Sequence, residues 1–315
     1  MKSISAKAPI NIALIKYWGK EDESRVIPYN SSLSITLDNL FTVTTIEESK
    51  TGFSFTLNNN ILKGKEEKRV YDFLKHYTTP KEINKVRVKS TNFVPTAAGL
   101  ASSASAFAAL SVAANEYFKT NFSFDKLALV TRLGSGSACR SLLGGFVAWE
   151  KDGRVYKVDS KVSNFILISV IIDSKSKKIS SRGAMAKSVK TSPMYSFYVE
   201  ESKKDFVDMK EAIENGDIIK IGNLTRKSFS MMHAVMLSTI PPILYMQDRS
   251  LAVIELADTL VLNGIYCYPT MDAGANVKLL TTKEDYEKVV LALEENGFID
   301  YYISRLGQGA TIIDE

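Results

Sequence analysis

The stretch "PTAAGLASSASAFAALSVAAN" begins at Pro95 and places serines directly before an alanine-rich run that favours a helix. Gly99 provides a turn, and the expected helix start carries three hydroxyls, those of Ser102, Ser103 and Ser105. Small side chains let a phosphate group approach the backbone N–H groups of a helix N-terminus, while serine hydroxyls add donors or ligate a phosphate-bridging Mg²⁺. The stretch therefore predicts a phosphate-binding loop, although a helix packed closely against a neighbour fits the composition equally well.

Two familiar nucleotide-binding patterns are absent from the sequence. Gly19 and Lys20 are followed by Glu21, so there is no GxxxxGK[ST] motif. The run that begins at Gly134 continues to Cys139 without a third glycine, so there is no GxGxxG motif. A phosphate site in this chain would therefore be of neither the P-loop nor the dinucleotide type.

Cationic and hydroxyl side chains recur in three other segments. "KYWGKE" contains Tyr17 and Lys20, and "GSGSACRSLLGG" sets Arg140 between pairs of glycines. "KKISSR" repeats this chemistry with Lys177, Lys178, Ser180, Ser181 and Arg182. An arginine fork matches a carboxylate or a phosphate in bidentate fashion, so these segments together suggest a strongly anionic substrate. The alternative is a set of unrelated, solvated loops.

One carboxylate and two histidines complete the candidates for chemistry. Asp272 in "PTMDAGANVKLL" stands either in an ordinary turn or among cations that keep it ionised. In the second case it could accept or orient a hydroxyl proton during phosphoryl transfer. His76 and His233 are more simply explained as structural residues, because the sequence has no GxSxG motif and no His/Cys cluster of metal-ligand spacing.

Bulk properties exclude several classes of protein. The net charge of +5 over 315 residues is mild and forms no basic block, so we expect no nucleic-acid partner. The longest strongly apolar run, "FILISVII" from Phe165, is too short to span a bilayer, and we expect no membrane association. Cys139 and Cys267 form neither a disulfide framework nor a CxxC pair, which favours the reducing cytoplasm.

The elements that would position these residues change in character along the chain. "SSLSITLD" alternates apolar and polar residues as a strand does, and "LFTVTTIEE" continues after a turn expected at Asp38 and Asn39. The second half contains long amphipathic helical patterns, "SFYVEESKKDFVDMKEAIENG" and "RSLAVIELADTLVLNG". We therefore expect an α+β protein with domains at residues 1–162 and 163–315.

Four segments, in this order, are similar to signature segments of the diphosphomevalonate decarboxylase family of the GHMP kinase superfamily: "IALIKYWGK", "PTAAGLASSAS", "GSGSACRS" and "MDAGANVKLL". "NSSLSITLD", "KKISSRGAM", "VKTSP" and "MHAVMLSTIPP" extend the resemblance over nearly the whole chain. It implies a ribosomal-S5-like N-terminal domain, a ferredoxin-like C-terminal domain, an active site between them and a homodimer.

The resemblance also implies a reaction of the mevalonate pathway of isoprenoid biosynthesis. ATP, with Mg²⁺, phosphorylates the 3-hydroxyl of mevalonate 5-diphosphate, and loss of phosphate and carbon dioxide then gives isopentenyl diphosphate. The implied catalytic residues are Asp272, Arg140 and Lys20. The implied substrate-binding residues are Tyr17, Lys20, Ser135, Ser137, Arg140, Ser181, Arg182, Met185 and Ala273. The implied ATP-binding residues are Gly99, Ser102, Ser103, Ser105, Lys177 and Lys178, with Ser103 also binding the metal.

Two departures from the family pattern and several related activities stay open at this point. Ala106 and Ala275 stand where the family often has glycine and proline. Sister enzymes act on mevalonate 5-phosphate or mevalonate 3,5-bisphosphate, or only phosphorylate mevalonate at the 3-hydroxyl. A non-catalytic binding protein of the same fold is the alternative of a different class.

Overall fold

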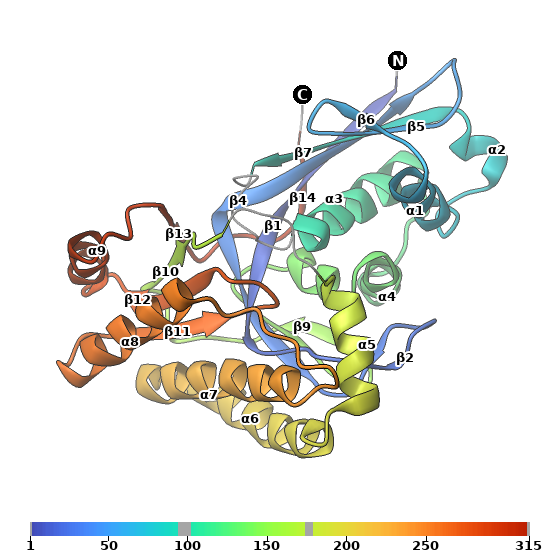
Figure 1. Cartoon of the computed structure of the whole chain (residues 1–315). Coiled ribbons are helices and arrows are strands. Elements are labelled where there is room, and N and C mark those ends of the chain that lie inside the picture. The colour runs from blue at the N-terminus through green and yellow to red at the C-terminus, as the bar shows by residue number, and fades with distance from the viewer. Residues whose placement is uncertain (1, 94–101, 174–178, 314–315) are drawn as a thin grey trace.

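Two large β-sheets, a small two-stranded sheet and the packed helices form the molecule in the computed structural model, which describes residues 2–93, 102–173 and 179–313 (Figure 1). The strands of the first sheet are β1 (Ser3–Ile15), β4 (Ser32–Glu48), β5 (Ser54–Leu57), β6 (Asn60–Leu62), β7 (Val86–Phe93), β8 (Phe146–Trp149), β9 (Val155–Lys157) and β14 (Thr311–Ile313). Their main order is β14-β1-β4-β7-β5-β6, with β8 pairing β4 and β9 pairing β8. The short strands β2 (Lys20–Asp22) and β3 (Ile27–Pro28) pair separately.

Helices of the first half cover one face of this sheet (Figure 1). They are α1 (Lys65–Leu74), α2 (Pro80–Ile83), α3 (Ser102–Tyr117), α4 (Phe124–Gly134) and the 3₁₀ helix η1 (Gly136–Leu142). Ser123 caps α4, since its hydroxyl accepts a hydrogen bond from the Lys126 backbone N–H. Within α3, alanines and serines face the sheet, so small side chains allow helix and sheet to approach closely.

The second sheet has the order β11-β12-β10-β13 and is antiparallel throughout. Its strands are β10 (Phe165–Val170), β11 (Cys267–Met271), β12 (Val277–Thr282) and β13 (Tyr301–Arg305). The helices of this half are α5 (Ser181–Thr191), α6 (Tyr195–Asn215), α7 (Ile218–Leu237), α8 (Asp248–Leu262) and α9 (Tyr286–Glu295). Residues of α8 and α9 pack on one face of the sheet, and residues of α6 and α7 join the core on the other. The predicted α+β class is confirmed.

The predicted turn at Asp38 and Asn39 is wrong. β4 runs through both residues as one long strand, and they are exposed where the strand passes from a fully buried half to an alternating half. The register between β1 and β4 shifts near this point, between Pro9 and Asn11. The two polar residues therefore mark a β-bulge region rather than a chain reversal.

One hydrophobic core joins the two halves of the chain. Ile10, Ile12 and Leu14 of β1 belong to the same buried cluster as Phe165 of β10 and Leu280 of β12. The last described strand, β14, returns to pair with β1, so both ends of the described chain meet in the first sheet (Figure 1). The predicted boundary at 162/163 therefore does not coincide with a gap in packing, and the division into domains stays a prediction. Among the described residues, no helix is long and apolar enough to cross a membrane.

Candidate active site

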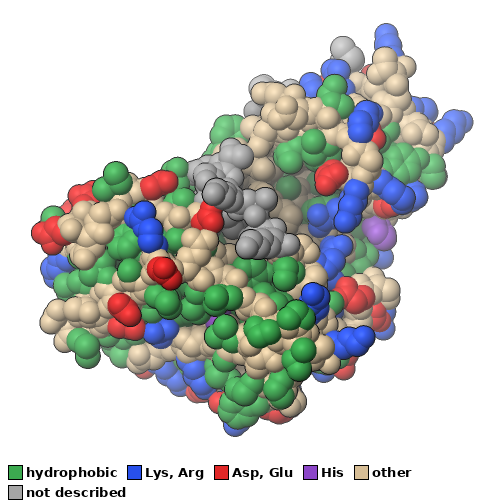
Figure 2. Space-filling view, viewed as in Figure 1, with side chains coloured by type: hydrophobic (Ala, Val, Ile, Leu, Met, Phe, Trp, Pro, Cys, Tyr) green, Lys and Arg blue, Asp and Glu red, His purple; other side chains and the backbone are tan. Residues whose placement is uncertain are grey.

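A cleft of about 490 Å³ collects residues from distant parts of the chain. Lys and Arg side chains gather beside the hollow on the face shown in Figure 2. The predicted site residues that line the cleft are Tyr17, Lys20, Ser103, Ser135, Ser137, Arg140, Ser181, Arg182, Met185, Asp272 and Ala273. They come from the segment after β1, the starts of α3 and α5, the loop and 3₁₀ helix after α4, and the end of β11.

Arg140 is a buried cation held by neutral partners. Its Nε donates to Ser34 Oγ at 3.1 Å, its Nη1 to Ser32 Oγ, and its Nη2 to Asn11 Oδ1 at 3.3 Å. Burial lowers the pKa of Arg140, and the fields of Cys139 and Asp272 oppose that shift. No carboxylate lies within ion-pair distance of this guanidinium among the described residues. A buried charge without a counter-ion favours an anionic ligand at this wall of the cleft.

Asp272 lies between two buried lysines. Lys16 Nζ is 2.9 Å from Asp272 Oδ1, and Lys278 Nζ is 3.2 Å from Asp272 Oδ2. Burial raises the pKa of Asp272, but the two ammonium groups outweigh burial and hold the pKa well below its usual range. The carboxylate is therefore ionised, and its side chain keeps 35% of its surface exposed to meet a ligand.

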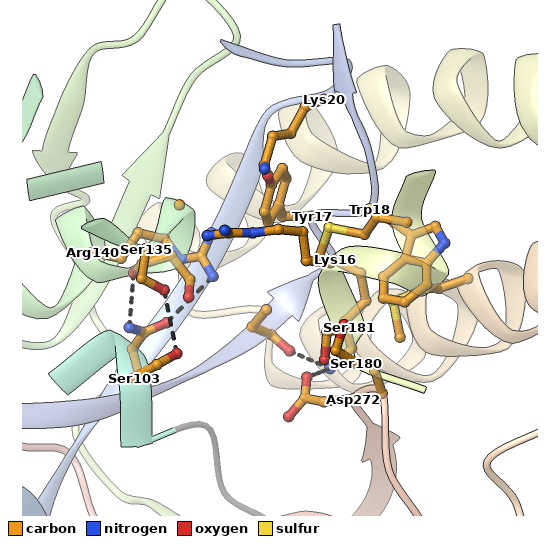
Figure 3. A pocket seen from close by; sticks show the side chains of 18 of the residues that line it. Lys16, Tyr17, Trp18, Lys20, Ser103, Ser135, Arg140, Ser180, Ser181 and Asp272 are labelled. Carbon is orange, nitrogen blue, oxygen red and sulfur yellow. Dashed lines mark hydrogen bonds and ion pairs between the residues drawn. The ribbon is translucent and has the colours of Figure 1, made fainter. Parts of the chain in front are cut away.

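The two groups of residues face each other across the pocket in Figure 3. Arg140, Ser103 and Ser135 lie on one side, with Ser103 Oγ 3.4 Å from Ser135 Oγ. Asp272 and Lys16 lie on the other side. The predicted phosphate loop and the predicted substrate loop therefore meet at Ser103 and Ser135.

Comparisons with known proteins identify the family of the chain. The family described as "Diphosphomevalonate decarboxylase-like N-terminal domain" matches residues 8–162, and "Mevalonate 5-diphosphate decarboxylase C-terminal domain" matches residues 166–303. The chain belongs to the diphosphomevalonate decarboxylase family.

Three relatives illustrate how much of the chain this membership covers. Diphosphomevalonate decarboxylase from Candida albicans is 37% identical over 93% of this chain and 88% of its own length. The crystal structure of mevalonate diphosphate decarboxylase from Staphylococcus aureus is 36% identical, has a TM-score of 0.93, and aligns over 99% of this chain and 98% of its own. A structure of MDDEF in complex with MVAPP, AMPPCP and magnesium is 37% identical, with a TM-score of 0.93 and 99% coverage of both chains. The chain therefore has the GHMP kinase fold.

Not every predicted member of the diphosphomevalonate decarboxylase site lies in the cleft. Ser105 is fully buried, and its hydroxyl contacts Thr42 Oγ1 at 2.7 Å and Ser102 O at 3.0 Å. Its position on α3 directs it to the sheet, so we do not retain it as an ATP ligand. Ser102 begins α3 but is not among the residues that line the cleft. Gly99, Lys177 and Lys178 lie outside the described residues.

Lys20 and Tyr17 both line the cleft, but Lys20 is a cation that already has a partner, whereas the Tyr17 hydroxyl is neutral and has none among the described residues. Lys20 Nζ already pairs with Glu23 Oε2 at 2.5 Å, so a substrate anion would share this cation with a carboxylate. The Tyr17 hydroxyl is buried and has no hydrogen-bond partner within the part of the chain that is described. Burial raises the pKa of Tyr17, which keeps the hydroxyl neutral and available as a donor.

The sequence singled out Lys20 but gave no role to Lys16, Lys278 or the residues of α1. Lys65 and Arg69 also line the cleft, and Arg69 Nη2 donates to Gly134 O at 2.6 Å, directly before the Ser135 loop. Lys16 and Lys278 could have been identified from the sequence, because each is a lysine within or directly after an apolar strand pattern. Arg69 carried no such signal, because it stands in an ordinary amphipathic helix.

The donor set of the cleft fits Mg²⁺ bound through phosphates rather than by a protein cage. The described residues contain no group of three or more His, Cys, Asp or Glu that could hold a metal ion. Mg²⁺ is commonly held by one or two protein oxygens together with water and substrate phosphates. The Ser103 hydroxyl can supply such an oxygen.

Proposed function

We propose that this chain catalyses the ATP-dependent decarboxylation of mevalonate 5-diphosphate to isopentenyl diphosphate, as an enzyme of the mevalonate pathway. The single observation that carries the proposal is an ionised Asp272 facing a cleft whose opposite wall holds the uncompensated Arg140. The relative that binds MVAPP together with AMPPCP and magnesium supports the same substrate classes.

In this proposal each group of the two substrates is bound by a different set of cleft residues. Arg140 binds the substrate carboxylate, and its three hydrogen-bonded nitrogens fix the plane of the guanidinium before substrate arrives. Hydroxyls and cations at Tyr17, Lys20, Ser137 and Arg182 bind the diphosphate. Ser103, at the N-terminus of α3, binds the ATP phosphates and the magnesium ion that balances their charge.

The role proposed for Asp272 follows from its depressed pKa. A carboxylate held so firmly in its ionised form is a weak base, so it orients the 3-hydroxyl toward the γ-phosphate more than it removes a proton early. Phosphorylation turns that hydroxyl into a leaving group. When the C3–O bond breaks, positive charge develops at C3, and Asp272 stabilises it. The bond to the substrate carboxylate then breaks, its electron pair forms the carbon–carbon double bond, and carbon dioxide leaves.

A substrate panel tests the proposal directly. Mevalonate, its 5-phosphate, its 5-diphosphate and its 3,5-bisphosphate are each mixed with ATP, and ADP and carbon dioxide are measured separately. We expect equal amounts of both products from the 5-diphosphate. Carbon dioxide without ADP from the bisphosphate would favour a sister decarboxylase, and ADP without carbon dioxide from mevalonate would favour a 3-kinase.

We further propose a cytoplasmic location and a homodimer. Both cysteines are free and buried, which suits a reducing compartment. The dimer is inferred from the family alone, and sedimentation of the purified chain at several concentrations would test it.

A further inference from the structure

Lys278 contacts the catalytic carboxylate without taking part in the cleft surface. Its Nζ is 3.2 Å from Asp272 Oδ2, its side chain is 3% exposed, and it is not among the residues that line the cleft. We propose that Lys278 is a positioning residue that anchors Oδ2 of Asp272 to the second sheet and fixes the direction in which the carboxylate faces the substrate. This inference rests on the function proposed above and assigns one more residue to that reaction.

Strand pairing holds Lys278 firmly in place. In the register of the second sheet, Lys278 of β12 lies directly opposite Ser169 of β10 and Thr270 of β11. Directly paired residues point to the same face, so these side chains form one buried row across three strands. The Ser169 and Thr270 hydroxyls have no hydrogen-bond partner among the described residues. Because the neighbours of Lys278 in this row are hydroxyl residues and not acidic ones, Asp272 is its ion-pair partner among the described residues.

The two lysines differ in what happens to them when substrate binds. Lys16 lines the cleft and donates to Ala13 O as well as to Asp272, so a ligand can contact it and change its hydrogen bonds. Lys278 lies behind the cleft wall, and its other hydrogen bond, to Asn276 O, is long at 3.4 Å. Lys278 is therefore the constant partner of the carboxylate, whereas Lys16 is the partner that substrate can perturb.

The other charged and titratable groups near Asp272 do not replace this anchor. Arg140 of η1 and His233 of α7 influence Asp272 through their surroundings, but neither forms an ion pair with its carboxylate among the described residues. With Lys278 removed, only Lys16 would hold the carboxylate, which could then rotate away from the direction in which it faces the substrate. A displacement of about 1 Å in a reacting group can cost about 100-fold in rate.

The test combines kinetics with a stability measurement that needs no turnover. Lys278→Met keeps the length of the side chain and removes the charge. We expect its kcat to fall about 10- to 100-fold, while KM for both substrates and the dissociation constant of a non-hydrolysable ATP analogue change less than about threefold. Lys227→Met is the matched control, because Lys227 pairs with the buried Asp205 at 2.7 Å outside the cleft. Its kcat should equal that of the unmodified chain.

A double-mutant cycle of unfolding free energies tests the anchoring contact itself. We expect Asp272→Asn and Lys278→Met to be non-additive, since Asp272→Asn leaves the buried Lys278 ammonium without its carboxylate, whereas Lys278→Met removes one of the two cations that pair with Asp272. Additive effects, or a kcat in Lys278→Met within threefold of the unmodified chain, would overturn the proposal. If Lys278→Met does not fold, Lys278→Gln replaces it, because glutamine also removes the charge; a lower kcat at unchanged KM would support the proposal and an unmodified kcat would refute it. An inactive unmodified chain with clear coupling would refute the proposed reaction but not the anchor.

Discussion

Asp272 is the one residue whose charge the proposed chemistry cannot replace. It is an anion set between Lys16 and Lys278, and it faces a cleft otherwise rich in donors. Asp272→Asn keeps the size of the side chain and removes the charge that would stabilise C3. We expect product formation to fall at least about 100-fold while ATP-analogue binding is retained. Rates of ADP and carbon dioxide release, with calorimetric titration of the analogue, measure the two effects.

The matched control for that change is Asp258→Asn. Asp258 forms an ion pair with Arg226 at 2.8 Å on the surface of the second half, outside the cleft. It should leave turnover unaltered, because exposed ion pairs contribute little. Near-normal turnover in Asp272→Asn would refute the role given to this carboxylate.

His233 gives the protein a pH-dependent stability. Burial lowers the pKa of His233 to about 4, and the charge of Lys16 adds to this effect. The unfolded chain therefore binds this proton first as pH falls from about 6.5 to about 4, so the contribution of His233 to stability is present above pH 6.5 and is lost below it. The loss amounts to about 3 kcal/mol by pH 4.

His233→Gln should flatten this part of the stability curve. Urea unfolding at a series of pH values between about 4 and 7 measures the slope for the variant and for the unmodified chain. His76→Gln is the control, because His76 is exposed to solvent and its removal should change the slope less. Identical slopes for His233→Gln and the unmodified chain would contradict the assignment.

Residue types in the sequence singled out Asp272, Arg140 and Ser103, because each stands in a short motif rich in small or polar neighbours, and the structure brings all three to one cleft. Lys16 and Lys278 were missed for different reasons. Lys16 reaches Asp272 from the other half of the chain, whereas Lys278 reaches it through the pairing of β11 with β12, and neither contact can be read from a local motif. Ser105 failed for a related reason. Its neighbours in sequence resemble a phosphate loop, but the turn of α3 directs its hydroxyl to Thr42.

At the scale of elements, α6 fixes the segment after β1 that carries Lys16. Tyr195 Oη donates to Trp18 O, and Tyr198 Oη donates to Lys16 O, each at 2.8 Å. The Lys16 carbonyl has a second donor, Asn30 Nδ2, also at 2.8 Å. No other hydrogen bond to Trp18 O occurs within the described ranges. Removal of the Tyr195 hydroxyl would therefore leave its carbonyl without a donor, whereas removal of the Tyr198 hydroxyl would leave its carbonyl with one.

We expect Tyr195→Phe to be the more costly of the two changes. It leaves the Trp18 carbonyl buried without a donor, which costs about 1–3 kcal/mol, whereas Tyr198→Phe removes one of two donors and costs about 0.5–1.5 kcal/mol. Chemical denaturation measures both values, with Tyr301→Phe as the control because that hydroxyl pairs with Glu294 on the surface. Equal losses, or a larger loss for Tyr198→Phe, would refute this account.

Some elements could be predicted from local pattern and others could not. The hairpin of β5 and β6 turns at Asn58 and Asn59, both with positive φ, a conformation that asparagine tolerates better than most residues. α7 was not identified, because Ser228, Met232 and other buried polar or flexible residues blur its apolar stripe. Both residues contact the cleft or the segment that forms it, since Ser228 Oγ accepts a hydrogen bond from the Lys16 backbone N–H and Met232 lines the cleft.

At the scale of the whole molecule, both halves line the candidate cleft, and both contribute to one hydrophobic core. Phe165 and Leu280 from the second half pack with Leu14 and Leu33 from the first. Thr36 Oγ1 donates to Gly307 O at 2.9 Å, and β14 completes the edge of β1. The change in composition near residue 162 was visible in the sequence, but this shared burial was not, because it depends on contacts between residues far apart in the chain.

A shared core predicts that neither half unfolds independently. Calorimetry of the whole chain should show one transition with equal calorimetric and van't Hoff enthalpies. Leu280→Ala should move that entire transition, with a loss of about 2–5 kcal/mol, because it opens a cavity that both halves line. Leu291→Ala, at an exposed position, should leave the temperature of the transition unchanged.

A fragment of residues 1–162 would expose its share of this core and lack β14, so we expect it to aggregate or remain unfolded. Two separable transitions, or a stably folded fragment, would show that the halves are independent and that Lys16 reaches Asp272 through docking rather than within one folded unit.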